Sequence, residues 1–278
     1  MRSQNIFPIA SHSLPAALHM VGIALLYKSR GELPNQRTIT LNLAVAEMLF
    51  CLLNVINSSV YLAASPVRVT LPYHATTQCL FAFLHCEIRV AMLHIIIDRF
   101  LCIWWNIKYP IYMSKRKLRI MIVFQWIGSF VFTVPIMLLT VFNASGQGSA
   151  GTASFYFDLV ILIVAVLNFL YIFFKVKGIV HENSSQGREQ NKTPSVWFKV
   201  KVPMFMVITF IIFNVSGSIW YFLDPEVVIT GHNFVHTLLR TSGWCSDALI
   251  YVLFQKRVRH LLKINCCRKD TENQVAVI

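Results

Sequence analysis

Charged side chains interrupt several long apolar runs in this sequence, and these are the positions where side-chain chemistry could occur. The clearest run is "HIIIDRFLCIWWNIKYP", residues 94–110, in which Asp98 and Arg99 stand side by side among isoleucines and tryptophans. Other runs contain Glu47, Glu87, Arg89, Arg240 and Asp247. Acids and bases in apolar surroundings form ion pairs, share a proton or hold a cation. The residue types therefore favour ion pairing or cation binding.

The elements that carry these charges are those of a membrane protein. The chain has 278 residues, of which 56% are hydrophobic and 13% charged, with a net charge of +13, and its mean hydropathy is +0.58. A soluble chain of this length needs a polar exterior, and these charges are too few to cover one. We therefore expect an all-α membrane protein.

Seven windows are long and apolar enough to span a bilayer, which needs about 20 such residues. They are 9–27, 38–64, 74–105, 118–142, 154–174, 202–223 and 233–254. The first window is the weakest and could be a signal peptide. However, no small-residue cleavage site follows it, and the stretch from Tyr27 to Arg30 is typical of the end of a membrane span. Both features favour a retained helix.

The basic residues predict the orientation of the spans. Of the 25 Lys and Arg residues, 20 fall after the first, third, fifth and seventh spans. Because cytoplasmic loops collect Lys and Arg, we expect an extracellular amino terminus and a multi-pass protein of the plasma membrane. The basic face suits anionic membrane lipid and an acidic partner surface. A nucleic-acid partner would need a soluble basic domain, and none is apparent.

The predicted organisation is a helical membrane domain over residues 1–265 and a cytoplasmic tail over residues 266–278. No internal repeat or soluble domain is apparent, so function must lie among the helices or on the cytoplasmic loops. This arrangement excludes most enzymes, and we expect no enzymatic activity.

Several motifs occur in an order that resembles the rhodopsin-like G-protein-coupled receptors. Asp98-Arg99-Phe100 resembles the Asp-Arg-Tyr triplet at the inner end of helix three, and "LNLAVAEML" (41–49) is similar to the helix-two signature with Glu47 as its acid. Trp126 stands at the usual distance into helix four. "SDALIY" (246–251) resembles Asn-Pro-x-x-Tyr, and "FQKRVRHLLKINCC" (254–267) resembles an amphipathic eighth helix. The resemblance covers residues 38–267 and implies a seven-helix bundle with that short eighth helix.

This resemblance implies a function as a receptor that passes the binding of an extracellular small-molecule or peptide ligand to a heterotrimeric G protein. Asp98 would hold Arg99 in the resting state, and outward movement of helix six would free Arg99 to meet the G protein. Phe100, Tyr171 and Tyr251 would complete this coupling region. From the residues alone, Arg99 could instead snorkel to lipid headgroups. Pairing of receptors into a dimer is a further expectation.

Glu47 and Asp247 occupy positions that face each other in the resembled family and hold a sodium ion there. In a low dielectric they could bind such a cation, share a proton, or pair with Arg89 or Arg240, and ion pairing is the favoured alternative. A protonated Glu47 bonded to the backbone is another alternative. We expect no other cofactor, and retinal is excluded because the last span contains no lysine for a Schiff base.

The ligand site implied by the resemblance lies among the outer halves of helices three, five, six and seven. Its expected lining is Phe81, His85, Asp158, Trp220, Tyr221, His236, Thr237 and Thr241. Aromatic residues at helical spacing also pack against neighbouring helices, so a packing role is the alternative for each.

Departures from the family pattern concern the conformational switch and the cysteines. Helix six has no proline, although Ser216-Gly217-Ser218 could give flexibility, and Ala248 replaces the helix-seven proline. The outer loop "NASGQGSAGTAS" (143–154) contains no cysteine for the family's disulfide. Cys266 and Cys267 are expected to be palmitoylated, with unmodified thiols as the alternative.

These departures keep two other functions open. A receptor-like protein without signalling could act by pairing with or retaining another receptor. A transporter or channel could use the intramembrane charges as a pathway, but it would need broken helices or repeated halves.

Overall fold

The computed structural model describes residues 2–28, 34–63, 71–105, 108–142, 156, 158–172, 174–175, 204–205, 208–216 and 234–253. Within these ranges the chain is helical and forms no strand, which confirms the expected all-α class. The named helices are α1 (Arg2–Lys28), α2 (Pro34–Ala63), α3 (Leu71–Trp105), α4 (Tyr109–Tyr112), α5 (Lys115–Phe142), the π-helix η5 (Ile211–Val215) and α10 (Phe234–Leu253).

Four helices of the described chain are long and apolar enough to cross a membrane. These stretches are Ile9–Lys28, Asn35–Ala63, Ala75–Trp105 and Lys115–Pro135, and Asp158–Ile172 forms a shorter apolar helix. They confirm a membrane-embedded, multi-pass character for the chain. Five of the expected windows thus contain helix with similar bounds, and α10 covers the seventh. The eighth helix and the tail at 266–278 lie outside the described residues.

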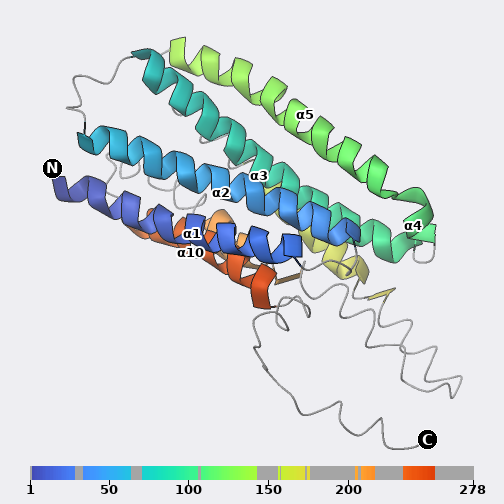
Figure 1. Ribbon diagram of the computed structural model, residues 1–278. Coiled ribbons are helices and arrows are strands. Elements are labelled where there is room, and N and C mark those ends of the chain that lie inside the picture. The colour runs from blue at the N-terminus through green and yellow to red at the C-terminus, as the bar shows by residue number, and fades with distance from the viewer. Residues whose placement is uncertain are drawn as a thin grey trace, which may run out of the picture.

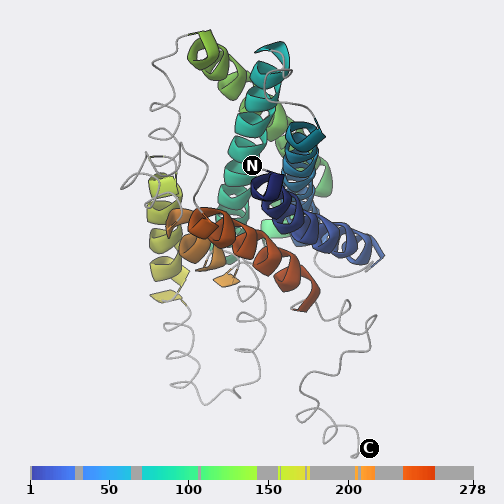
Figure 2. The same cartoon turned by 90° about the vertical axis from the view of Figure 1, so that its left-hand side faces the viewer.

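The long helices pack side by side with their axes roughly aligned, as Figure 1 shows for α1, α2, α3 and α5. α2 contacts α1 and α3, α3 contacts α5, and α10 lies along α1. In the turned view, α3 stands between α2 and the Asp158–Ile172 helix (Figure 2). This central position explains why α3 carries most of the polar contacts described below.

The side-chain contacts fix the relative directions of the helices. Asn42 of α2 donates a hydrogen bond to Glu87 of α3, and Phe50, further along α2, packs on Phe81, which comes earlier in α3. The two helices are therefore antiparallel. In contrast, Arg89 and Ile96 of α3 contact Asp158 and Asn168 respectively, so α3 and the Asp158–Ile172 helix are parallel.

The directions of α5 and α10 follow from their contacts with α3 and α2. His94 and Glu87 of α3 both contact Gln125, while Phe83 packs on Phe130, which makes α5 antiparallel to α3. Phe50 packs on Trp244, and Glu47 interacts with Asp247, so α10 runs antiparallel to α2. It follows that α10 and α3 have the same direction.

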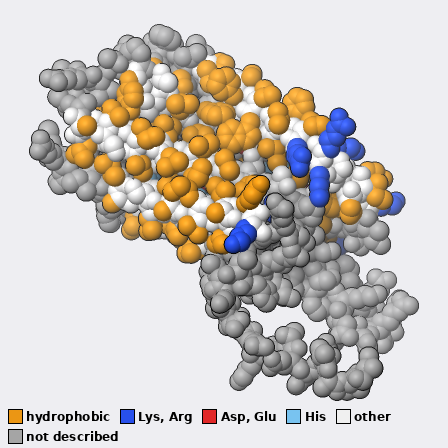
Figure 3. Space-filling model, viewed as in Figure 1, with side chains coloured by type: hydrophobic (Ala, Val, Ile, Leu, Met, Phe, Trp, Pro, Cys, Tyr) orange, Lys and Arg blue, Asp and Glu red, His pale blue; other side chains and the backbone are white. Residues whose placement is uncertain are grey.

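The hydrophobic core lies between α1, α2, α3 and α10. Leu26, Leu43 and Met92 are fully buried there, and Phe210 joins the core from the segment before η5. Figure 3 shows that the outer surface over α1, α2, α3 and α5 is also predominantly hydrophobic. α5 contributes strongly to this surface, since Phe124 is 68% exposed. A bilayer is the solvent that makes such a surface favourable.

The connection between α3 and α5 contains the short helix α4, which the sequence analysis did not predict. Pro110 lies in its first turn, where a missing N–H is tolerated. Ser114 then starts α5, because its hydroxyl oxygen accepts the Lys117 N–H at 3.4 Å and its carbonyl accepts the Leu118 N–H at 3.0 Å. These turns hold Tyr109 against the end of α3.

Candidate functional site

Asp98 and Arg99 form a buried ion pair near the end of α3. Arg99 Nε donates to Asp98 Oδ2 at 3.0 Å, and a second guanidinium nitrogen donates to the same carboxylate. Consecutive helix residues do not face each other, so the long arginine side chain must curl back to make this contact. Arg99 is only 4% exposed. This burial argues against the alternative in which Arg99 snorkels to headgroups.

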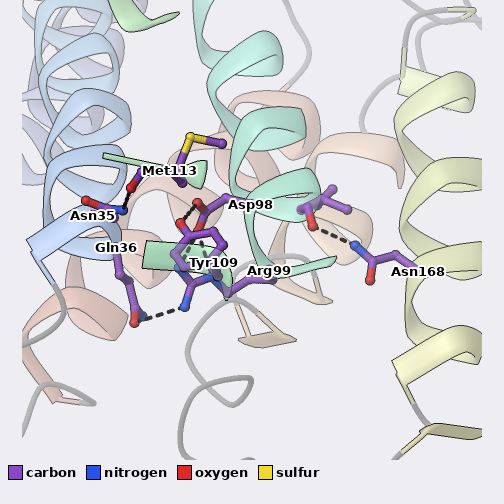
Figure 4. Close-up of polar contacts among 8 residues, drawn as sticks. Asn35, Gln36, Asp98, Arg99, Tyr109, Met113 and Asn168 are labelled. Atoms are coloured by element: carbon purple, nitrogen blue, oxygen red, sulfur yellow. Dashed lines mark hydrogen bonds and ion pairs between the residues drawn. The ribbon is translucent and has the colours of Figure 1, made fainter. Parts of the chain in front are cut away.

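Two further side chains complete the surroundings of this pair (Figure 4). The Tyr109 hydroxyl of α4 donates to Asp98 Oδ1, and Arg99 donates to Oε1 of Gln36, in the first turn of α2, at 3.3 Å. We call Asp98, Arg99, Gln36 and Tyr109 the α3 latch. The pairing of Asp98 with Arg99 was predicted, but Gln36 and Tyr109 were missed because no local pattern links them to α3.

The electrostatics of the α3 latch keep Tyr109 in its donor form. Burial, reinforced by the neighbouring Asp98 carboxylate, raises the pKa of the Tyr109 hydroxyl well above its usual range. The hydroxyl therefore stays protonated through the physiological range and satisfies one Asp98 oxygen. Next to it, Asn35 Nδ2 donates to the Met113 carbonyl at 2.7 Å, which fastens α2 to the chain after α4.

A second arginine–aspartate pair lies deeper in the bundle. Arg89 of α3 donates to both oxygens of Asp158, through Nε at 2.5 Å and a terminal nitrogen at 2.9 Å. Its remaining terminal nitrogen contacts the ring of His85, one turn earlier on α3. Arg89 and Asp158 are 5% and 1% exposed. Asp158, expected to line a ligand pocket, thus ties the Asp158–Ile172 helix to α3.

A polar network around Glu87 joins α2, α3 and α5. Glu87 Oε1 accepts from Gln125 at 2.6 Å and from Asn42 at 3.4 Å, while Oε2 accepts from Ser129 at 2.9 Å. Asn42 in turn accepts the Trp126 indole N–H at 2.7 Å. The carboxylate is fully buried but has three neutral donors. Such full satisfaction gives the helix interface a specific register.

The expected buried core of Glu47 and Asp247 is present between α1, α2 and α10. Glu47 lies 3.5 Å from the His19 ring nitrogen, and the Thr209 hydroxyl donates to Asp247 at 2.8 Å. Glu47 and Asp247 also interact through their carboxyl groups. Arg89, which the sequence favoured as a partner of these acids, makes its bidentate contact with Asp158 instead. Arg240 is half-buried on α10.

Cation binding by this core stays a prediction. Among the described residues, no group of three or more His, Cys, Asp or Glu side chains is arranged to hold a metal ion. Sodium, however, takes neutral oxygen ligands as well as carboxylates, and Thr209 supplies one such oxygen beside Asp247. Glu47 and Asp247 are both 1% exposed, which would make an unbalanced double negative charge very unfavourable.

Aromatic rings gather around Phe50 of α2, about one helical turn from Glu47. Phe50 packs edge-on against Phe81 and stacks on His85, with ring centroids 5.6 Å apart in each case. It also contacts Trp244 of α10, which packs in turn on His12 of α1. Phe81 and His85, expected to line the ligand site, thus join an aromatic cluster between four helices.

The remaining predicted residues are placed as follows. Phe100 packs on Tyr171 with centroids 5.0 Å apart, which brings two expected coupling residues together. Thr241 is buried on α10. The backbones of His236, Thr237 and Tyr251 belong to α10, but their side chains are not described. Trp220, Tyr221, Cys266 and Cys267 lie outside the described residues. The five described cysteines, Cys51, Cys79, Cys86, Cys102 and Cys245, are free thiols.

The sixth predicted span contains a π-helical turn, η5, over Ile211–Val215. Ser216 closes this turn, because its hydroxyl donates to the Ile212 carbonyl. A π-helical turn and a serine that bonds back to the preceding turn both bend helices. Thr209, just before η5, links this region to Asp247 of α10. A π-helical turn therefore stands in this span without a proline, in the segment that contacts the buried acid Asp247.

No protein-family model matches the chain, and no curated protein matches it. The site must therefore be interpreted from its own geometry. That geometry consists of two arginine–aspartate pairs that involve α3, a buried acid core and a π-helical turn beside it.

Proposed function

We propose that the chain is a seven-helix membrane receptor that transmits the binding of an extracellular small molecule or peptide to a cytoplasmic G protein. The observation that carries this proposal is the α3 latch. An arginine that is buried near a helix end and held by the side chains of Asp98 and Gln36 can exist in a second, released state. A two-state element of this kind is what a conformational signal requires.

The helix directions support a seven-crossing topology. The Asp158–Ile172 helix and α10 both run parallel to α3. Two parallel helices in a membrane must be separated by an odd number of crossings, so the chain between them must cross at least once more. The apolar window 202–223 is the only predicted span available there. With α1, α2, α3, α5, the Asp158–Ile172 helix and α10, this crossing would bring the number of spans to seven.

The latch would act by exchange of partners. In the resting state Arg99 contacts Asp98 and Gln36, and these contacts join α3 to the start of α2. Movement of α2 away from α3 would remove the Gln36 contact, and a new side-chain conformation of Arg99 would then exchange Asp98 for a partner outside the bundle. The released guanidinium is a strong donor for carbonyl or carboxylate groups of a G protein. The predominance of basic residues in the same loops favours the cytoplasmic side for this event.

The π-helical turn η5 would provide the movement. Ligand binding at the aromatic cluster of Phe50, Phe81, His85 and Trp244 would shift α10, which Thr209 couples to the segment before η5. Conversion of this π-helical turn to regular α-helix would rotate the remainder of the helix. A sodium ion or a proton at Glu47 and Asp247 would bias the same region.

The intramembrane charges favour a receptor over a transport pathway. Arg89 pairs with Asp158, Glu87 is satisfied by neutral donors, and Glu47 lies near His19. These are three separate clusters at different helix interfaces. A conducting pathway would instead place such groups along one continuous opening.

The test is guanine-nucleotide exchange by G proteins in membranes that contain the protein, during a ligand screen. We expect Arg99→Ala to abolish exchange while surface expression persists. Lys28→Ala, which also removes one positive charge but from an exposed position, should leave exchange intact. Unchanged exchange in Arg99→Ala would contradict the proposal. Co-purification of another receptor without any exchange would favour the non-signalling function, and a substrate-dependent ion current would favour transport.

The proposed orientation has a separate test. An epitope tag at the carboxyl terminus should be detected by antibody only after permeabilisation of the cells. Detection on intact cells would place Arg99 outside the cell and contradict the G-protein proposal.

A further inference from the structure

The exposed charge of the described chain is concentrated at the junction of α4 and α5. Lys108, Lys115, Arg116, Lys117 and Arg119 are all exposed there, and we call them the basic cluster. Figure 3 shows Lys and Arg side chains gathered at this end of the molecule, beside the broad hydrophobic surface. Four of the five fall within a single turn and a half of helix.

These cations have no carboxylate beside them among the described residues. Each acidic residue that the structure describes is buried, with an exposed fraction of 1% or less: Glu47, Glu87, Asp98, Asp158 and Asp247. The sequence contains no Asp or Glu between residues 98 and 158. Like charges at this density repel one another unless a counter-charge is present. That counter-charge is best supplied by a bound anion.

The position of the basic cluster indicates which anion. Arg116 precedes Ile120 and Phe124 at intervals of four residues, so the three share one face of α5. Ile120 and Phe124 are 45% and 68% exposed and belong to the surface that faces lipid. Arg119 precedes Val123 and Ile127 in the same way. Arg116 and Arg119 therefore lie at the end of the lipid-facing surface of α5.

Neighbouring side chains mark the same boundary. Tyr112 and Trp104 are exposed, and Ile111 of α4 is 74% exposed beside Lys108. Tyr and Trp are enriched where the hydrocarbon region meets the headgroups. An acidic soluble protein would approach from the water beyond the helix ends. An anionic headgroup instead reaches Arg116 and Arg119 while its acyl chains lie along Val123 and Phe124.

We propose that the basic cluster binds an anionic phospholipid with a multiply phosphorylated headgroup. Phosphate oxygens match the planar donors of Arg116 and Arg119, and Lys115 and Lys117 supply additional positive charge. The acyl chains pack on the exposed apolar residues of α5. This inference depends on the membrane embedding of the chain and is independent of G-protein coupling.

The experiment measures the binding of short-chain lipids to the full chain in neutral detergent micelles. The titrants are phosphatidylinositol bisphosphate, phosphatidylserine, phosphatidylcholine and free inositol trisphosphate. The wild type should bind the bisphosphate lipid most tightly and the neutral lipid most weakly. Arg116→Gln/Arg119→Gln should weaken bisphosphate-lipid binding by about 25-fold, since each headgroup-level charge contributes about five-fold.

A matched variant controls for net charge. Lys28→Gln/Arg37→Gln removes two positive charges from the ends of α1 and α2, and it should change binding less than about two-fold, because those charges lie outside the cluster. Far-ultraviolet circular dichroism and the unfolding midpoint should match the wild type in both variants. If Arg116→Gln/Arg119→Gln folds poorly, Lys115→Gln/Lys117→Gln takes its place.

Three results would overturn the proposal. Equal weakening by the two double variants would show a general charge effect. Equal affinity for free inositol trisphosphate and for the lipid would identify a soluble anion as the ligand. Unchanged lipid binding by Arg116→Gln/Arg119→Gln would exclude the basic cluster as a lipid site, and lost guanine-nucleotide exchange in the same variant would then assign it to an acidic protein. The lipid readout does not require signalling, so failure here is distinguishable from failure of the receptor proposal.

Discussion

α3 carries two arginine–aspartate pairs that have the same chemistry but different topology. Arg89 and Arg99 are ten residues apart, which places them about 15 Å apart along the helix. Arg89 pairs with Asp158 on another helix, 69 residues away in sequence, whereas Arg99 pairs with its chain neighbour Asp98. Both pairs are buried. The difference is that only the Arg89 pair joins two helices.

This difference determines what happens when each pair opens. Separation of Arg89 from Asp158 requires movement of one helix or leaves two unpaired charges in the membrane. Separation of Arg99 from Asp98 requires only a new side-chain conformation of Arg99. The first pair is therefore suited to fix the bundle, and the second to change state. The same residue types thus serve stability at one position and switching at the other.

The largest expected effect is that of Asp158→Ala. It leaves Arg89 buried without its carboxylate, which should reduce the free energy of unfolding by about 3 to 5 kcal/mol. Asp98→Ala should have a smaller effect, because Arg99 can move toward solvent at the helix end. Denaturant unfolding in detergent micelles measures both. Equal losses for the two variants would contradict the assigned difference between the pairs.

The double variant Arg89→Met/Asp158→Leu should recover most of the stability lost in Asp158→Ala. Burying two charges carries a large desolvation penalty, so apolar side chains of similar size can replace a buried pair at little loss, within about 1 kcal/mol of the wild type. The same unfolding assay decides. A double variant as unstable as Asp158→Ala would show that Arg89 has an essential contact beyond Asp158, such as the one with His85.

Local sequence patterns predicted the helices but not the partners of the charges. Apolar windows of sufficient length gave the spans of α1, α2, α3 and α5, because each helix faces lipid or core along its whole length. The Asp98–Arg99 pair was predicted because the two residues are adjacent. Arg89 and Asp158 were both noted, but as members of different sites, since only tertiary packing brings residues 69 positions apart together.

The Glu87 network was missed for a related reason, although the sequence contained a signal. Gln125 and Ser129 are four residues apart in an otherwise apolar window, so they share one face of α5. A polar face on a membrane helix indicates a buried partner, and Glu87 is that partner. Gln36 and Tyr109 gave no such signal, because both lie at helix ends where polar residues are common. The π-helical turn also follows from packing rather than from any local motif.

Tyr109→Phe is expected to affect the α3 latch with little effect on the fold. It removes one donor to the Asp98 carboxylate, a hydrogen bond to a charged group that contributes about 1.5 to 3 kcal/mol at most. Asp98 and Arg99 would then be less firmly held, and basal guanine-nucleotide exchange should rise a few-fold. Because the pKa of Tyr109 is raised, the wild-type bond should persist as pH rises to mildly alkaline values. Unchanged basal exchange in this variant would remove Tyr109 from the latch.

The smallest expected effect distinguishes contacts between helices from contacts within one. Asn168 Nδ2 donates to the Ile96 carbonyl of α3 at 2.6 Å, two turns along from the Arg89–Asp158 pair. Asn168→Ala removes a neutral hydrogen bond and should reduce the free energy of unfolding by about 1 kcal/mol. Asn54 makes the matched contact within α2, since its Nδ2 donates to the Phe50 carbonyl at 2.9 Å.

Asn54→Ala should therefore reduce stability less than Asn168→Ala, because the contact that it removes does not hold two helices together. The two variants have the same chemistry and differ only in which helix supplies the carbonyl. Equal unfolding midpoints would mean that the Asp158–Ile172 helix is held to α3 by apolar packing and the Arg89 pair alone. A larger effect of Asn168→Ala would identify this bond as a second interhelical contact, close to the α3 latch.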